Sequence, residues 1–190
     1  MISKKHLYFI GFLTLFGFGL VGALIIEKFI NQPFFFVFEH GITWHLQLLI
    51  GVLYGTITAF IGWAIIKSRL LAPVKNHYVE LIQSLKMNKF DIIFLSFCAG
   101  VGEEIFFRGA IQHFLGIWIT SFLFIILHGY INPFNWRLSI YGLVMAFFIV
   151  GLSYLYEYAG MLTAMAAHFT IDVFLLVKLT NQYQDRKFDS

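Results

Sequence analysis

Residues 7–26 read LYFIGFLTLFGFGLVGALII, twenty positions without a charged side chain. About 20 apolar residues in a helix cross the hydrocarbon core of a bilayer, so this stretch is expected to be a membrane span. It exceeds the apolar core of a signal peptide, which is roughly 7–15 residues long. No cleavage site of small residues follows it, since Ala23 is succeeded by Leu-Ile-Ile-Glu. The segment is therefore interpreted as a retained first span.

The composition extends this interpretation to the whole chain of 190 residues. Hydrophobic residues make up 59% and charged residues 12%, against about 45–50% and about 25% in soluble domains. One soluble core cannot bury so much apolar surface, whereas lipid can cover it. The net charge of +3 is modest, and no basic run with interleaved aromatic residues indicates a nucleic-acid surface. The single cysteine, Cys98, excludes an internal disulfide.

Further stretches of the same character follow the first span. Their expected bounds are Leu46–Ile66, Asp91–His113, Ile117–Ile131, Leu138–Tyr156 and Met161–Leu179. Helices are expected, because an open chain in lipid must satisfy its own backbone hydrogen bonds. The predicted fold is thus an all-α polytopic membrane helix bundle, a single domain over residues 1–190 with about six spans. Between spans, Asn31–His45 suits an interfacial hairpin or short helix, and Asn76–Phe90 an amphipathic helix on the membrane surface.

Lysine and arginine positions predict the orientation in the membrane. With six spans and an inner N-terminus, one basic residue, Lys28, falls in an outer loop, and Arg108 falls within a span. The inner segments hold Lys4, Lys5, Lys67, Arg69, Lys75, Lys86, Lys89, Arg137, Lys178, Arg186 and Lys187. Eleven basic residues in inner segments, against one in an outer loop, predict a multi-pass protein of the cell membrane with both termini in the cytoplasm.

The third expected span carries ionisable residues, which are costly in a bilayer and usually mark function. Glu104 and Arg108 are four positions apart, so they share a helix face and can pair. Glu103 points about 100° away and lacks that partner. A carboxylate without a counter-ion in apolar surroundings suits a general base that works near neutral pH.

Two later spans place further ionisable groups at a similar depth. His128 lies in the fourth span, and His168 and Asp172 lie in the sixth, four apart on one helix face. A lone membrane histidine is more often a contact between helices than a catalyst, and Glu104 with Arg108 alone fits a packing ion pair equally well. Five such groups at one depth are hard to explain by packing and predict an active site.

These residues, in this order, resemble the CPBP family of intramembrane proteases, which includes CAAX prenyl endopeptidases and bacteriocin-processing, Abi-like relatives. The family pattern is Glu-Glu-x-x-x-Arg, then Phe-x-x-x-His, then His-x-x-x-Asn or Asp. Here Glu103-Glu104 with Arg108, Phe124 with His128, and His168 with Asp172 match it. The resemblance covers a motif core of about residues 91–179.

The resemblance implies a protease that cleaves peptide bonds of membrane-associated proteins or peptides in a cavity open to the lipid. Glu103, helped by His128, would activate water, while His168 and Asp172 would stabilise the oxyanion. Arg108 would orient Glu104 as part of the supporting shell. This mechanism needs no cofactor. An alternative treats Glu103, His128, His168 and Asp172 as Zn²⁺ ligands.

Residue 172 bears on that choice, because an asparagine donates a hydrogen bond directly whereas Asp172 donates only when protonated. As a carboxylate it would be the better metal ligand. Two other functions remain as alternatives: a non-catalytic partner or immunity protein of the same fold, and a proton-coupled carrier. The intact motif residues disfavour the first, and the lack of paired broken helices or inverted repeats disfavours the second.

Overall fold

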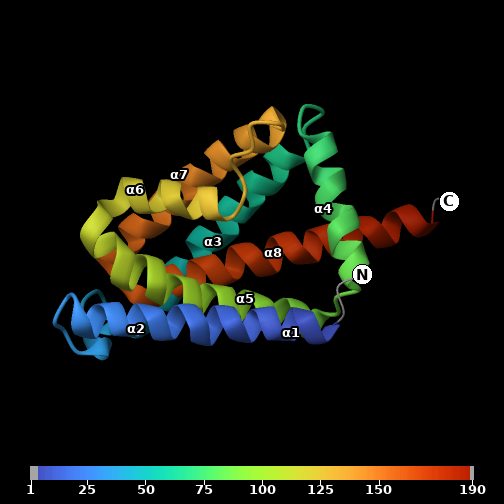
Figure 1. The fold of residues 1–190 in the computed structure, drawn as a ribbon. Coiled ribbons are helices and arrows are strands. Elements are labelled where there is room, and N and C mark those ends of the chain that lie inside the picture. Colours follow the sequence, from blue (N-terminus) through green and yellow to red (C-terminus); the bar gives the residue numbers. More distant parts are fainter. Residues whose placement is uncertain (1–3, 189–190) are drawn as a thin grey trace.

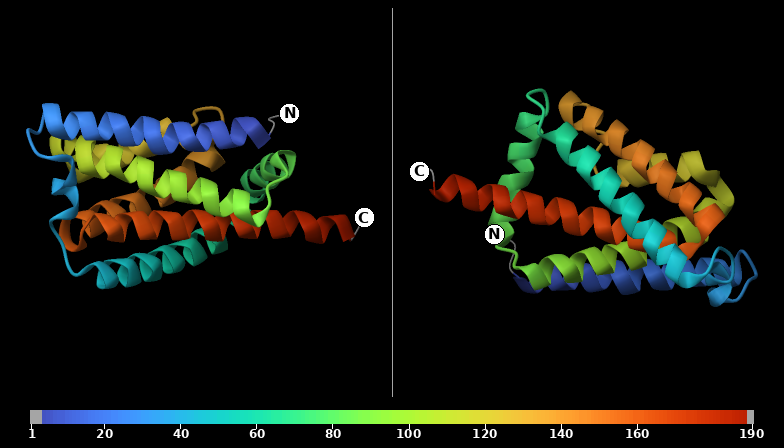
Figure 2. Two further views of the ribbon diagram at one scale, coloured as in Figure 1. Left: turned by 90° about the horizontal axis from the view of Figure 1, so that it is seen from below. Right: turned by 180° about the vertical axis from the view of Figure 1, so that it is seen from behind.

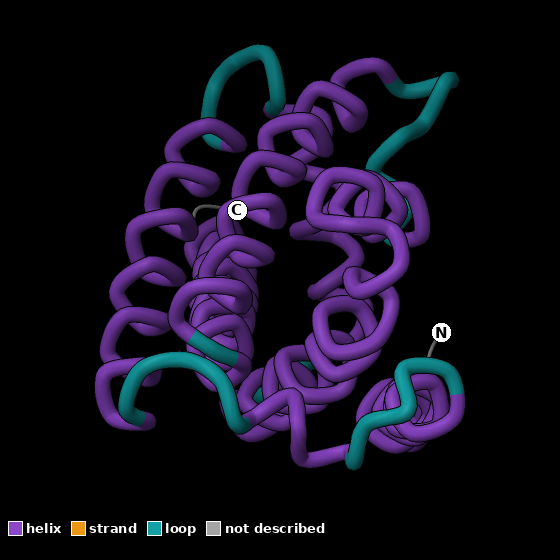
Figure 3. The backbone as a smooth tube through the Cα atoms, turned by 90° about the vertical axis from the view of Figure 1, so that its left-hand side faces the viewer, coloured by secondary structure: helices purple, strands orange, loops and turns teal. Residues whose placement is uncertain are grey.

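The computed structural model describes the backbone of residues 4–188 and the side chains of residues 4–182. Within this part of the chain, every regular element is a helix and no strand occurs (Figure 3). The prediction of an all-α bundle is therefore confirmed. The side chains of Arg186 and Lys187, which the sequence places among the inner basic residues, lie outside those described.

The helices follow one another with short connections (Figure 1). The first long helix consists of α1, a π-helical segment η1 and α2. A short 3₁₀-helix, η2, lies between α2 and α3. In order, the elements are α1 Lys4–Phe12, η1 Leu13–Phe18, α2 Gly19–Lys28, η2 Phe34–Phe38, α3 Trp44–Ile66, α4 Ala72–Leu85, α5 Lys89–Glu104, the π-helical η3 Ile105–Ile111, α6 Gln112–Leu127, α7 Trp136–Ala159 and α8 Met161–Phe188.

Five helices among the described residues are long and apolar enough to cross a membrane. They are Lys4–Lys28, Trp44–Ile66, Lys89–Leu127, Trp136–Ala159 and Met161–Gln182. The third and fourth expected spans both fall in Lys89–Leu127, which counts as one helix of 39 residues. Gly116, at φ 69° and ψ 174°, breaks that helix. After the break, α6 turns back and runs beside α7 (Figure 1).

The C-terminal bound of the expected fourth span, Ile117–Ile131, is therefore wrong. The α6 helix stops at Leu127, so His128 caps the helix instead of lying within it. Gly129 adopts a left-handed conformation at φ 72°. The amides of Gly129 and Tyr130 bond back to the carbonyls of Ile126 and Ile125. This is a Schellman motif, which ends a helix by satisfying its last carbonyls.

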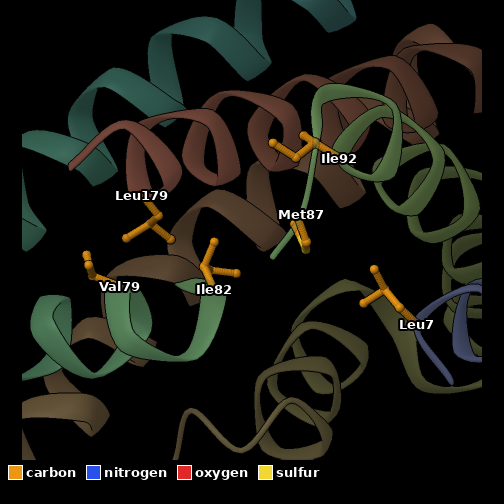
Figure 4. Packing of buried hydrophobic residues seen from close by; sticks show 6 residues of the cluster. All are labelled: Leu7, Val79, Ile82, Met87, Ile92 and Leu179. Atoms are coloured by element: carbon orange, nitrogen blue, oxygen red, sulfur yellow. The ribbon is translucent and has the colours of Figure 1, made fainter. Parts of the chain in front are cut away.

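The two expected intervening segments also form helices. The amphipathic helix is α4, which begins at Ala72, earlier than predicted, and ends at Leu85. The next residue, Lys86, adopts a left-handed conformation. The apolar face of α4 packs on α8 and belongs to the cluster in Figure 4, which also includes residues of α1 and α5: Leu7, Val79, Ile82, Met87, Ile92 and Leu179. The segment Asn31–His45 contains the short η2 helix.

The α3 and α8 helices pack with their backbones close together, which fixes the helix that carries His168. Gly51 and Gly55 face α8, and a Cβ atom at either would lie 2.5 Å from the carbonyl oxygen of Thr163 or Ala167, respectively. Small residues four apart allow such an approach where lipid provides no hydrophobic drive between helices. In Figure 2, α1 and α2 run alongside α5, whereas α3 and α7 cross the bundle at an angle, with α4 across one end.

Candidate active site

The Glu103-Glu104 pair lies at the C-terminal end of α5, where two glycines bring neighbouring helices close. A Cβ atom on Gly102 would lie 2.3 Å from the carbonyl oxygen of Thr14 in η1. One on Gly100 would lie 3.1 Å from backbone atoms of α8. These glycines let α5 approach η1 on one side and α8 on the other, so both glutamates come within reach of His168.

The helix changes from α to π immediately after Glu104, and Arg108 lies in the π-helical η3. Such segments are rare and frequently occur at functional sites. Nη1 of Arg108 donates a hydrogen bond of 3.1 Å to Oε1 of Glu104, and neither side chain is exposed. The predicted ion pair is therefore present. The guanidinium carbon also lies 5.1 Å from the centre of the Phe124 ring.

Glu104 has a second partner that the sequence did not indicate. Its Oε1 lies 2.6 Å from Nδ1 of His168, a residue 64 positions away. Because a carboxylate only accepts hydrogen bonds, His168 Nδ1 is the donor. This bond leaves Nε2 of His168 facing the other site residues, 4.0 Å from Oε2 of Glu103 and 3.6 Å from Oδ2 of Asp172.

Glu103 makes no bond to Arg108, yet it is not isolated as the sequence suggested. Its Oε2 lies 3.3 Å from Nε2 of His128 as well as 4.0 Å from Nε2 of His168. Oε2 is buried and has no well-aligned hydrogen bond among the described residues. Helix geometry within one span could not show these neighbours, which come from the end of α6 and from α8, although the family resemblance implied that His128 assists Glu103.

His128 is held by its own helix end. Its Nδ1 lies 2.8 Å from the carbonyl oxygen of Phe124, and its ring stacks on the Phe124 ring at 4.0 Å between centroids. With Nδ1 occupied, Nε2 is the nitrogen directed at Glu103. The two histidines thus share one arrangement, in which Nδ1 is bound by a supporting oxygen and Nε2 faces Glu103.

A cavity of about 110 Å³ contains this chemistry. Its lining includes Glu103, His128, His168 and Asp172, together with Phe124, Tyr130 and apolar residues of α7. That volume holds more than one water molecule. The structure therefore brings together the four residues that the sequence singled out, while Glu104 and Arg108 lie behind His168 and support it.

A larger cavity of about 260 Å³ adjoins this site and is lined mostly by apolar atoms of α3, α4, α7 and α8. Its lining includes Tyr78 on α4, and burial raises the pKa of Tyr78 to about 12. The phenol therefore stays protonated at neutral pH and acts as a neutral polar group.

The donor set has the chemistry of a zinc site, since it offers two imidazole nitrogens and two carboxylates. Both histidines also bind a supporting oxygen through Nδ1, as metal-ligating histidines usually do. However, in the described part of the chain no three His, Cys, Asp or Glu side chains are grouped so as to hold a metal ion.

Comparison with known proteins supports the motif assignment. Residues 86–174 match the type II CAAX prenyl endopeptidase Rce1-like family. Over 83 residues the chain is 40% identical to the uncharacterised protein YpbD of Bacillus subtilis (strain 168), a match that covers 43% of this chain and 41% of that protein. No solved structure matches the chain.

The long apolar helices make this a multi-pass membrane protein. The matched residues contain every motif position from Glu103 to Asp172. The resemblance that those motifs carry is confirmed, since residues 86–174 match the Rce1-like family of type II CAAX prenyl endopeptidases.

Proposed function

We propose that this protein is an intramembrane endopeptidase that hydrolyses a peptide bond of a membrane-associated protein or peptide through water activated by Glu103. One observation carries the proposal. The Glu103 carboxylate lies in a small cavity, 3.3 Å from Nε2 of His128 and 4.0 Å from Nε2 of His168. A general base must come within hydrogen-bond reach of the water that it deprotonates, and this cavity has room for that water.

In the proposed reaction, water attacks the carbonyl carbon of the scissile bond while its proton passes to Glu103. His128, next to the same carboxylate oxygen, helps to hold the water. The tetrahedral intermediate then collapses, the carbon–nitrogen bond breaks, and the proton moves from Glu103 to the leaving amine.

His168 and Asp172 lie on the other side of Glu103 and would stabilise the oxyanion of the intermediate. Fixed donors at the developing charge commonly contribute 10²–10³-fold to the rate. Glu104 accepts a hydrogen bond from Nδ1 of His168, so Nε2 is the nitrogen that faces the cavity, and it donates to the oxyanion when the imidazole is protonated on both nitrogens. Arg108 neutralises Glu104 and is a positioning residue in this scheme.

A zinc-dependent form of the same protease is the alternative. Glu103, His128, His168 and Asp172 would then supply the ligands, and the metal would provide Lewis-acid activation of water. The Nε2 atoms of His128 and His168, each fixed by a hydrogen bond at Nδ1, fit this alternative.

The test is Glu103→Gln, which keeps the size of the side chain but removes the base. We expect cleavage to be abolished while expression and membrane insertion persist. Protein termini in membranes that contain wild type, Glu103→Gln or the control Glu80→Gln, an exposed residue on α4, are compared by mass spectrometry. Termini that depend on Glu103 alone identify substrates. Identical termini in all three would refute the proposal and favour a non-catalytic partner.

A further inference from the structure

The cavity of about 110 Å³ that contains Glu103, here called the catalytic cavity, and the larger apolar cavity of about 260 Å³ meet at two residues. The catalytic cavity has Glu103 and the two histidines in its wall, and the larger cavity extends from there to α4. Tyr130 and Asp172 are the residues that line both. Because Asp172 already belongs to the proposed catalytic group, Tyr130 is the unassigned polar residue at this junction.

The backbone holds Tyr130 in place on both sides. Its amide closes the Schellman motif that ends α6, with a hydrogen bond of 3.0 Å to the Ile125 carbonyl. On the opposite side, Gly142 of α7 leaves room for it. A Cβ atom at position 142 would lie 2.7 Å from Cβ of Tyr130 and 2.9 Å from its carbonyl oxygen. Residue 130 is therefore fixed by contacts to two helices, as a precisely placed catalytic group must be.

The ring of Tyr130 lies between one catalytic residue and one residue of the larger cavity. It is nearly parallel to the His128 imidazole, with centroids 6.3 Å apart, and meets the Tyr141 ring edge-on at 5.9 Å. The larger cavity is otherwise mostly apolar. In such a site, a few placed polar groups fix the orientation of the bound molecule.

We propose that Tyr130 is a further catalytic residue whose phenol O–H donates a hydrogen bond to a backbone carbonyl of the substrate. The substrate chain extends from the catalytic cavity into the larger cavity, and the bond at the junction turns the scissile carbonyl toward Glu103 and His168. The phenol is needed only as a hydrogen-bond donor, so no proton leaves it. This inference rests on the proposed proteolytic function.

The decisive variant is Tyr130→Phe, which removes the hydroxyl and keeps the ring. Its matched control is Tyr156→Phe, since Tyr156 is a half-buried tyrosine on α7 that lines neither of the two cavities. The probe is a synthetic peptide spanning the strongest Glu103-dependent cleavage site found in membranes. Tyr130→Phe should lower kcat/KM about tenfold, the effect of one lost hydrogen bond, with an unchanged melting temperature. Tyr156→Phe should change kcat/KM less than twofold.

A second pair of variants tests the placement of Tyr130 without altering its side chain. Gly142→Ala pushes on the backbone of residue 130 and should also lower kcat/KM. Gly62→Ala is the control, because its Cβ would meet one Phe148 ring carbon at an ordinary 3.5 Å. All rates are measured below the melting temperature of the least stable variant, so that unfolding does not contribute.

The outcomes separate this inference from the proposed function. Wild-type kcat/KM in Tyr130→Phe, with Glu103→Gln inactive, would overturn the role of Tyr130 and leave the protease assignment intact. Equal losses in Tyr130→Phe and Tyr156→Phe would also overturn it, because the effect would then follow from the loss of a tyrosine hydroxyl anywhere on α7 or beside it and not from a contact at the junction. Absence of any Glu103-dependent cleavage would overturn both.

Discussion

At position 104, one carboxylate oxygen serves two partners. Oε1 of Glu104 accepts from Nη1 of Arg108 at 3.1 Å and from Nδ1 of His168 at 2.6 Å, and the three side chains are buried. Nε and Nη2 of Arg108 have no hydrogen-bond partner among the described residues, so Glu104 is the counter-ion that the structure provides. Glu104 therefore contributes to both the stability of the bundle and the orientation of His168.

Glu104→Gln should therefore impair stability and activity together. The amide leaves the Arg108 cation buried without a counter-ion, and removing one partner of a buried ion pair costs about 3–5 kcal/mol. Thermal unfolding of the purified protein in detergent measures this loss, with Glu80→Gln as the exposed control. Glu103→Gln should differ by losing activity at a nearly unchanged melting temperature. A Glu104→Gln protein as stable as wild type would contradict the supporting role.

Asp172→Asn distinguishes the two mechanisms. Without a metal, the asparagine amide donates a hydrogen bond to the oxyanion as protonated Asp172 would, so activity should persist or rise. With zinc, the change removes an anionic ligand or a partner of His168, 3.6 Å away, and metal affinity should fall about 10–100-fold. Activity and bound metal are measured after chelation. Loss of wild-type activity on chelation, with recovery in zinc, would overturn the metal-free mechanism.

At the scale of elements, the contact between α3 and α8 determines where His168 lies. Gly55 packs against the carbonyl oxygen of Ala167, the residue that precedes His168. Thr170, two residues beyond His168, also approaches Gly55, with its Cβ 2.8 Å from a Cβ built at position 55. The packing surface of α8 and its catalytic residues therefore lie on the same turns of helix.

Gly55→Ala should consequently move α8 as well as weaken the bundle. A Cβ 2.5 Å from a carbonyl oxygen forces the two backbones apart, and overpacking of this kind costs about 1–3 kcal/mol. We expect a lower melting temperature and reduced proteolysis, whereas Gly62→Ala on the same helix should leave both unchanged. Equal behaviour of the two variants would show that the close contact at Gly55 is dispensable.

For the whole molecule, α1 begins and α8 ends at the same end of the bundle (Figures 1 and 2). The start of α7 lies at that end too, because Tyr141 and Met145 pack with Ile66 of α3 and Val74 of α4. The chain thus returns across the bundle through α6 and residues 128–135. The five membrane-length helices among the described residues therefore agree with an even number of crossings, because the chain crosses the bundle once more through α6 and residues 128–135.

The excess of basic residues at this end predicts that it faces the cytoplasm. Single cysteines introduced at Ser68 and Gln32, which lie in exposed connections at opposite ends of α3, test the orientation. The native Cys98 is fully buried and should not react. An impermeant maleimide applied to intact cells should label Gln32→Cys and spare Ser68→Cys. The reverse pattern would place both ends of the chain outside.

The sequence by itself determined the features that depend on one helix at a time. Apolar runs of membrane length predicted the helices, and the spacing of four residues predicted that Glu104 pairs with Arg108, as it does. The family motifs were also readable, because they are short segments of single helices. The end of α6 was predicted wrongly, although Gly129 is a signal for it in the sequence.

Only the tertiary structure decided which groups meet across helices. The bond from His168 to Glu104, the two histidines around Glu103 and the position of Tyr130 between two cavities join residues from different helices. In a bundle that is apolar on every side, hydrophobic periodicity does not reveal which face of a helix contacts which neighbour. The close backbone contacts at Gly55, Gly100 and Gly142 set those faces, and they exist only after the helices have packed.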